Sequence, residues 1–241
     1  MKSLVKTALN RFGFEITRVG GLNTGFSEHL RNVLRAKSID CVIDVGANSG
    51  QYGAELRKLG FKGFIVSFEP VKKVFLELER HAKSDDKWLC YNFALGDVEA
   101  KKPINVYGST VFSSFLEAND YSKNIWSSLN NVDVENVDVI RLDDLFSEIV
   151  EKSGGENFYL KMDTQGFDKN VFEGALGSLD RIRAMQSELS LISVYSGMPD
   201  AYDVLKLFHE NDYHISGMYP INRDKSLAVI EYDCVLVKVA T

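Results

Sequence analysis

Residues 42–52, VIDVGANSGQY, join a short apolar run to an amphipathic segment through a turn that contains two glycines. From this stretch onward, nearly all-apolar runs of strand length alternate with segments that carry apolar residues at helical spacing. Such alternation indicates a mainly parallel sheet with helices on both faces. The predicted strands are 41–46, 61–70, 88–96, 157–163 and 181–190, and the predicted helices are 48–60, 71–83, 167–179 and 201–212.

Two parts of the chain depart from this alternation. Between residues 98 and 150, a Ser- and Asn-rich stretch separates two candidate strands, 104–108 and 137–142, and predicts a lid or a substrate loop. Near the C-terminus, residues 213–220 and 227–239 are strand-like and flank a polar turn, which predicts a closing antiparallel pair.

The domain boundary is predicted near residue 38. Residues 1–38 are expected to form a helical N-terminal extension, in which Ser27 is a candidate N-cap, and residues 39–241 the main domain. The first residues lack both an uninterrupted apolar core and a small-residue cleavage site, so no signal peptide is predicted. No apolar run reaches the length of a transmembrane helix.

Composition limits the class of protein. The chain of 241 residues is 45% apolar, which is enough for a sizeable core, and its net charge of -6 argues against nucleic-acid binding. The three cysteines lie in strand-like runs without metal-ligand spacing; they are Cys41, Cys90 and Cys234. They are predicted to be buried thiols of a protein in the reducing cytoplasm.

The glycine turn limits the ligand that this edge of the sheet can hold. In an open parallel sheet, ligands bind beyond the carboxyl ends of the strands, and Gly46 and Gly50 allow the backbone to approach a ligand closely. Their spacing is Gly-x-x-x-Gly, which lacks the G-x-G-x-x-G of dinucleotide sites and the Lys-Ser/Thr pair of P-loops. Nucleoside diphosphates are therefore disfavoured.

Two acids narrow the ligand further. Glu69 ends the second predicted strand, where a carboxylate can accept hydrogen bonds from both ribose hydroxyls. Asp44 lies within the first strand, where an acid suits a ligand with a positive amino group. A ribose, an ammonium group and no diphosphate together describe S-adenosylmethionine. The alternative is that Asp44 ties down the turn and Glu69 caps the helix that begins at Val71.

Short motifs in a fixed order strengthen this interpretation. They are DVGANSGQY (44–52), FEP (68–70), NFALGD (92–97), RLDDLF (141–146), LKMDTQGFD (160–168), QSELS (186–190) and VYSGMP (194–199). From about Ile39 onward, the chain resembles the FkbM-type S-adenosylmethionine-dependent methyltransferases. The resemblance implies a Rossmann-like class I methyltransferase fold: α/β, with a mainly parallel seven-stranded sheet, helices on both faces and an antiparallel C-terminal strand. It also implies methylation of hydroxyl groups on sugars, glycolipids or secondary metabolites.

The resemblance implies roles for individual residues. Those expected around the methionine part of S-adenosylmethionine are Asp44, Gly46, Ala47, Asn48, Gly50 and Gln51. Those expected at the ribose and the adenine are Glu69, Pro70, Asn92 and Ala94. Candidate acceptor-binding residues are Ser113, Ser114, Gln165 and Tyr195. The DTQG sequence at 163–166 departs from the acidic ending of many family members, which puts in doubt any role given to an acid at position 165.

The catalytic candidates lie at the ends of the fourth and fifth predicted strands. Lys161 and Asp163 are two residues apart and so lie on one face of the strand. Methylation of an alcohol requires alignment with the methyl donor and removal of a weakly acidic proton. The hypothesis is that Asp163 orients or deprotonates the hydroxyl, Lys161 tunes its charge and Glu188 completes the polar wall. Asp168 is a further acid near this edge, but no oxygen-ligand loop is recognised, so no metal is predicted.

Alternatives remain at the level of function. The leading interpretation is an O-methyltransferase with a small-molecule or glycan acceptor, and N-methylation is left open. A nicotinamide-dependent oxidoreductase shares the strand-turn-helix and the ribose acid but lacks the G-x-G-x-x-G motif. A non-catalytic module that keeps the fold as a scaffold or cofactor sensor is the alternative from another class. The sequence predicts no nucleic-acid partner and is compatible with a homo-oligomer.

Overall fold

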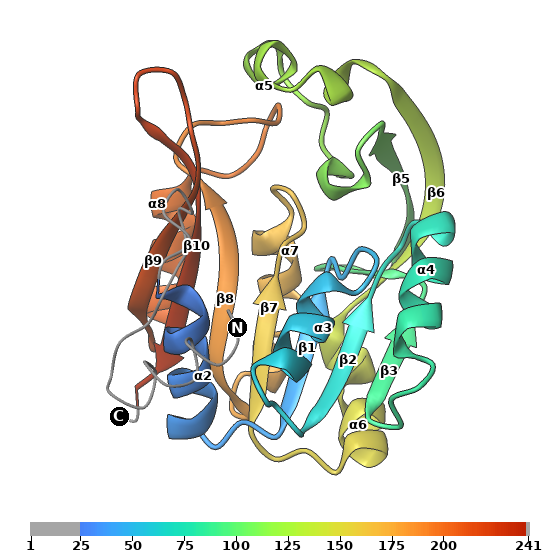
Figure 1. Cartoon of the computed structure of the whole chain (residues 1–241), viewed down its shortest axis with the longest axis vertical. Helices are drawn as coiled ribbons and strands as arrows, with labels where there is room; N and C mark the ends of the chain where they lie inside the picture. The colour runs from blue at the N-terminus through green and yellow to red at the C-terminus, as the bar shows by residue number, and fades with distance from the viewer. Residues whose placement is uncertain (1–24, 240–241) are drawn as a thin grey trace, which may run out of the picture.

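The computed structural model describes residues 25–239 and contains a seven-stranded main sheet (Figure 1). Its strands are β1 Cys41–Val45, β2 Phe64–Phe68, β3 Trp88–Tyr91, β7 Phe158–Met162, β8 Ile182–Ser190, β9 Tyr213–Arg223 and β10 Val229–Lys238. The order across the sheet is β3-β2-β1-β7-β8-β10-β9. Strands β3, β2, β1, β7 and β8 are parallel, and β10 is antiparallel to both of its neighbours. The predicted mainly parallel sheet with an antiparallel C-terminal strand is confirmed.

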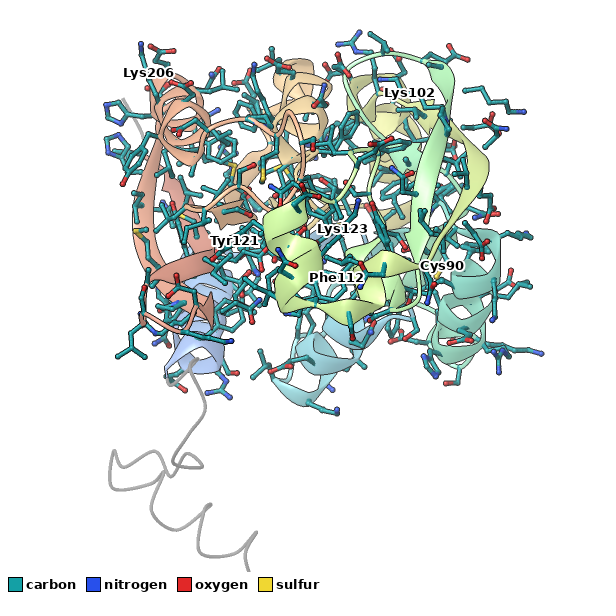
Figure 2. All side chains as sticks on the ribbon, turned by 90° about the horizontal axis from the view of Figure 1, so that it is seen from above. Cys90, Lys102, Phe112, Tyr121, Lys123 and Lys206 are labelled. Carbon is teal, nitrogen blue, oxygen red and sulfur yellow. The ribbon has the colours of Figure 1, made fainter. Side chains whose placement is uncertain are left out.

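Helices cover both faces of the main sheet, as Figure 2 shows from above. One face is covered by α2 Phe26–Ala36, α3 Gln51–Lys58 and α4 Lys72–Ala82. The other face is covered by α6 Leu142–Ser153, α7 Asp168–Glu173 and α8 Ala201–Glu210. Each helix packs through an apolar stripe: α2 buries Leu30, Val33 and Leu34, and α8 buries Val204 and Phe208. Among residues 25–239, no helix has the length and hydropathy that a membrane crossing requires.

A second sheet, of three strands, follows β3 in the chain. It consists of β4 Ala94–Leu95, β5 Ala100–Tyr107 and β6 Val132–Ile140, in the order β4-β6-β5. Between β5 and β6 lie η1 Thr110–Phe112, α5 Asp120–Ile125 and η2 Ser127–Asn130. These short helices lie above the carboxyl ends of β7 and β8 in Figure 1, and around the labelled Phe112 and Tyr121 in Figure 2. We call residues 94–140 the insertion. Its strands β5 and β6 overlap the strands predicted at 104–108 and 137–142, but β6 ends at Ile140 and α6 begins at Leu142.

The third predicted strand, 88–96, is wrong as a single element. β3 ends at Tyr91, and the amide of Asn92 donates to the carbonyl oxygens of Glu69 (2.9 Å) and Pro70 (3.0 Å). The chain therefore turns out of the main sheet at Asn92. The residues that follow form β4, which pairs with β6 in the second sheet.

Two predicted helix boundaries are also wrong. The helix predicted over 167–179 ends at Glu173, and a short 3-10 turn, η3 Leu176–Ser178, follows it. The Gly174 carbonyl accepts the N–H of Asp143 in α6 (3.0 Å) and so does not continue the helix. Ser27 is not an N-cap, since α2 starts from Gly25 and the Ser27 hydroxyl donates to Glu55. Of the predicted extension 1–38, residues 1–24 lie outside the described residues, and the boundary at residue 38 stays a prediction.

Candidate active site

A cavity of about 380 Å³ lies at the carboxyl ends of β1, β2, β7 and β8. The insertion forms part of its wall and supplies Ile104, Thr110, Val111, Ser113 and Phe115. At one end the cavity reaches Phe26 of α2 and Ile221 of β9. Because parallel strands end at a common edge, residues from Phe26 to Asp233 meet around one space.

The turn from β1 into α3 has glycine where another residue would not fit. Gly46 has φ of +74°, and a Cβ there would lie 1.9 Å from the carbonyl oxygen of Asp163. Gly50 precedes α3 with φ of +92° and backs onto Trp88, so it shapes the turn without lining the cavity. The turn residues that do line the cavity are Gly46, Ala47, Asn48 and Gln51.

Glu69 is buried at the end of β2 and lines the cavity. One carboxylate oxygen accepts the N–H of Asn48 (3.0 Å), and the other accepts the N–H of Val71 (2.9 Å) just before α4. Burial, partly offset by these hydrogen bonds, raises the pKa of Glu69 to about 7. Glu69 therefore fixes the start of α4 while its carboxylate stays at the cavity wall, so the two sequence interpretations of this residue are compatible.

Asp44 lies in a row of buried polar residues that crosses the sheet. The parallel register places it opposite Ser67 of β2 and Lys161 of β7. The Ser67 hydroxyl donates to Asp44 (3.2 Å), and the Lys161 ammonium lies 3.1 Å from its other oxygen. Asp44 is fully buried and does not line the cavity, so its cationic partner is a lysine of the protein itself.

Lys161 joins this row to the cavity. Its ammonium also lies 3.3 Å from Asp163, donates to the Gly46 carbonyl (3.2 Å) and sits 5.3 Å from the ring centre of Tyr52. Burial lowers the pKa of Lys161, but attraction to Asp163 and Asp44 outweighs burial and raises the pKa above its usual range. Lys161 is thus a cation at neutral pH that stabilises negative charge and does not act as a base.

Asp163 and Glu188 form a carboxylate pair at the ends of β7 and β8. The side-chain nitrogen of Gln165 lies 3.2 Å from Asp163 and 3.3 Å from Glu188. Burial raises the pKa of Asp163, yet Lys161 and hydrogen bonds lower it overall. For Glu188, burial and the charges of Asp163 and Glu231 all act in one direction and raise the pKa well above its usual range. These opposite shifts mean that Glu188 binds a proton more readily than Asp163 does.

Another part of the cavity wall is apolar. Ala94 and Leu95 of β4 lie there with Phe115 and Phe167, whose ring centres are 4.7 Å apart. Asn92, predicted beside the adenine, does not line the cavity because its amide is used to turn the chain after β3.

The predicted acceptor residues divide into two groups. Ser113 and Gln165 line the cavity. Ser114 and Tyr195 lie behind Gln165: the Ser114 hydroxyl donates to its carbonyl oxygen (2.7 Å), and the Tyr195 hydroxyl donates to its side-chain oxygen (2.8 Å). These two residues therefore support a lining residue.

Sequence reasoning missed a polar network on the β10 side. The Tyr52 hydroxyl donates to the Gln186 side chain (3.1 Å), which in turn donates to Asp233 (2.9 Å). All three line the cavity, and burial together with the charge of Asp163 raises the pKa of Asp233 to about 6. A signal was present, because Asp233 is an acid inside a mostly apolar strand and Gln186 begins the QSELS motif. Thr110 and Phe115 of the insertion carried no such signal.

Asp168 has a structural role. One of its oxygens accepts the Thr164 N–H (2.9 Å), and the other accepts the Ser187 hydroxyl (2.6 Å) and the Glu188 N–H (3.1 Å). It thereby ties the loop after β7 to β8. Over residues 25–239, no group of three or more His, Cys, Asp or Glu residues is arranged to hold a metal ion.

The family model described as the methyltransferase FkbM domain matches residues 44–215. The chain belongs to the FkbM methyltransferase family. The part of this FkbM methyltransferase that matches runs from β1 into β9, and so includes the glycine turn, Glu69 and the Asp163–Glu188 pair. None of the curated protein sequences matches it.

Several solved structures resemble this FkbM methyltransferase in fold. An rRNA methylase from Streptococcus thermophilus is 10% identical, with a TM-score of 0.48 over 93% of this chain and 100% of that one. The methyltransferase domain of bacterial CtHen1 is 11% identical, with a TM-score of 0.47 over 90% and 100%. Aeropyrum pernix fibrillarin, with natively bound S-adenosyl-L-methionine, is 10% identical, with a TM-score of 0.44 over 86% and 73%. The family assignment does not depend on these likenesses.

Proposed function

We propose that this chain uses S-adenosylmethionine to methylate a hydroxyl group of a small-molecule or glycan acceptor. The observation that carries the proposal is that one cavity combines the glycine turn, the buried Glu69 and the Lys161–Asp163–Glu188 group. S-adenosylmethionine supplies the electrophilic methyl group. The residues present fit it, since the glycine turn lines the cavity and the buried Glu69 presents a carboxylate where a ribose is expected.

The proposed binding mode follows the character of the cavity wall. Glu69 accepts hydrogen bonds from the ribose hydroxyls, in addition to the two backbone N–H groups that already donate to it. Ala47, Asn48 and Gln51 lie beside the methionine part. The apolar wall near Pro70 and Ala94 takes the adenine.

The proposed chemistry uses the carboxylate pair. Asp163, which Lys161 keeps ionised, accepts a hydrogen bond from the acceptor hydroxyl and orients its oxygen. Transfer of the methyl group to this oxygen would break its bond to sulfur and leave S-adenosylhomocysteine, and the hydroxyl proton would pass to Asp163, the ionised member of the pair. Lys161 stays protonated throughout: it offsets the charge of Asp163 before the transfer and keeps Asp44 as its partner afterwards.

The acceptor class is proposed from the family resemblance to be a sugar, a glycolipid or a secondary metabolite. Two features of the wall support a polyhydroxy acceptor. Asp163, Gln165 and Glu188 provide hydrogen-bonding groups, and the rings of Phe115 and Phe167 provide an apolar surface.

Transfer of a labelled methyl group from S-adenosylmethionine tests this proposal. The full chain would be assayed with matched pairs of compounds that differ only in a hydroxyl or an amino group, with product position determined by NMR. Label on the oxygen of the hydroxyl compounds is expected. Label on nitrogen alone would contradict O-methylation, and binding of S-adenosylmethionine without transfer to any compound would favour a non-catalytic module.

A further inference from the structure

Gln165 has a backbone conformation that needs an explanation. Its φ is +53°, in the left-handed region that residues other than glycine rarely occupy, and Gly166 follows with φ of +91°. Such a conformation persists where the surrounding contacts determine it, and it often occurs at functional sites. The contacts of Gln165 are therefore informative.

The side chain of Gln165 connects three parts of the molecule. Its nitrogen contacts Asp163 (3.2 Å) at the end of β7 and Glu188 (3.3 Å) at the end of β8. Its side-chain oxygen accepts from the Tyr195 hydroxyl (2.8 Å), which also lies 3.0 Å from the carbonyl oxygen of Phe112 in the insertion. Asp163, which Lys161 keeps ionised, only accepts hydrogen bonds, so the nitrogen faces the pair and the oxygen faces Tyr195.

The charges around the pair explain why an amide is suited to this position. Lys161 reaches Asp163 but has no contact with Glu188. A neutral donor between the two acids compensates both of them without adding charge. A carboxylate at position 165 would instead add a third acid to the pair.

We propose that Gln165 is a positioning residue that holds the side chains of Asp163 and Glu188 together on one wall of the cavity, and that Tyr195 fixes the orientation of its amide. The proposal rests on the proposed function for the chemical role of the pair. Gln165 also connects the pair to the insertion, because the Ser114 hydroxyl donates a hydrogen bond to the Gln165 carbonyl oxygen (2.7 Å).

The test is an NMR titration of the full chain labelled with ¹³C in the aspartate and glutamate carboxyl groups. Gln165→Asn keeps the amide and suits a positive φ, because asparagine adopts this region more readily, but it withdraws the nitrogen from the pair. Tyr195→Phe removes only the orienting hydroxyl. Tyr213→Phe is the matched control, since it removes a buried hydroxyl that donates to the Ile182 carbonyl (2.8 Å) outside the cavity.

The wild-type carboxyl ¹³C signal that is missing from the spectrum of Glu188→Gln belongs to Glu188 and reports on the titration of the pair. Its upper apparent pKa is expected to rise by about one unit in Gln165→Asn, because the doubly ionised pair loses a hydrogen-bond donor. The upper apparent pKa of the pair is also expected to rise in Tyr195→Phe and to stay unchanged in Tyr213→Phe. An unchanged titration in Gln165→Asn would overturn the role of Gln165, and a change there without one in Tyr195→Phe would overturn the role of Tyr195.

Two further results keep the outcomes separate. If Gln165→Asn does not fold, the Tyr195→Phe titration decides: a rise in the upper apparent pKa supports the proposal, and an unchanged pKa overturns it. Titration of S-adenosylhomocysteine into the same samples tests the proposed function independently. If the wild type does not bind it, the proposed function fails, while the carboxyl titration without ligand still decides whether Gln165 controls the pair.

Discussion

Four ionisable side chains at the cavity acquire different protonation states from their neighbours. Lys161 stays charged because two carboxylates surround it, and it lowers the pKa of Asp163. Glu188 has no such cation, and burial and the charge of Asp163 raise its pKa, while burial raises the pKa of Glu69 to about 7. In the proposed function, Asp163 anchors the acceptor hydroxyl and Glu69 binds the ribose.

Asp163→Asn is expected to separate catalysis from cofactor binding. Loss of an acid–base group lowers turnover by about 100-fold or more. Affinity for S-adenosylhomocysteine should change little, since Lys161 keeps Asp44 as its partner. Steady-state methyl transfer and calorimetry would measure both, with Asp133→Asn on the exposed part of β6 as the control. Turnover close to that of the wild type would show that Asp163 is not the orienting group.

Glu69 should make cofactor affinity depend on pH. To accept two backbone N–H groups and two ribose hydroxyls, the Glu69 carboxyl must be ionised. In the protein without ligand, the pKa of Glu69 is about 7. Binding therefore requires loss of a proton below this pH, and affinity for S-adenosylhomocysteine should be roughly tenfold weaker at pH 6 than at pH 8. Calorimetry at both values measures the effect. Glu69→Gln should bind weakly and without this slope, and equal wild-type affinity at both pH values would contradict the assignment.

At the level of elements, the local sequence pattern was sufficient to predict those strands and helices whose own apolar residues are buried in the core. The apolar runs of β1, β2, β7 and β8 and the stripes of α4 and α8 were predictable because burial selects them directly. β3 ends where Asn92 reaches the carbonyls of Glu69 and Pro70, and α7 ends where the Gly174 carbonyl accepts the N–H of Asp143 in α6. These contacts join segments that are distant in the sequence, so no local sequence pattern predicts them.

Gly46→Ala should destabilise the protein more than an alanine placed at another glycine of positive φ, because it adds a steric clash to the unfavourable φ. Gly60 is the matched control, because it has φ of +91° and no atom lies within 4 Å of the place that a Cβ would take, whereas at Gly46 the Cβ would meet Asp163. Gly60→Ala is expected to lower the free energy of unfolding by about 1 kcal/mol, and Gly46→Ala by about 3 kcal/mol or more. Urea denaturation measures both, and equal losses would show that the backbone contact between β1 and β7 is not tight.

At the level of the whole molecule, the site is assembled from two sheets. The residues at the ends of the parallel strands were predictable, since the fold brings Gly46, Glu69, Asp163 and Glu188 to one edge. The contributions of the insertion were mostly not predictable, because Thr110 and Phe115 reach the cavity through the path of the chain between β5 and β6.

A ligand in this cavity should therefore protect both sheets from hydrogen exchange. Thr110 already lies 3.3 Å from the side chain of Asn48, so the insertion and the glycine turn meet at the cavity wall. With S-adenosylhomocysteine, amide exchange is expected to slow in residues 46–51 and also in residues 110–116. Mass spectrometry of the exchanged chain measures this, and slowing in the glycine turn alone would contradict a wall shared between the two sheets.

The most direct test of the account is isothermal calorimetry with S-adenosylmethionine, S-adenosylhomocysteine and NADH. The wild-type chain and Glu69→Ala would be compared with Glu77→Ala, which changes an exposed acid on α4. The account predicts that the wild type and Glu77→Ala bind both adenosyl ligands and not NADH, and that Glu69→Ala loses this binding. A wild-type chain that binds neither adenosyl ligand, or a Glu69→Ala variant that binds them as the wild type does, would contradict it.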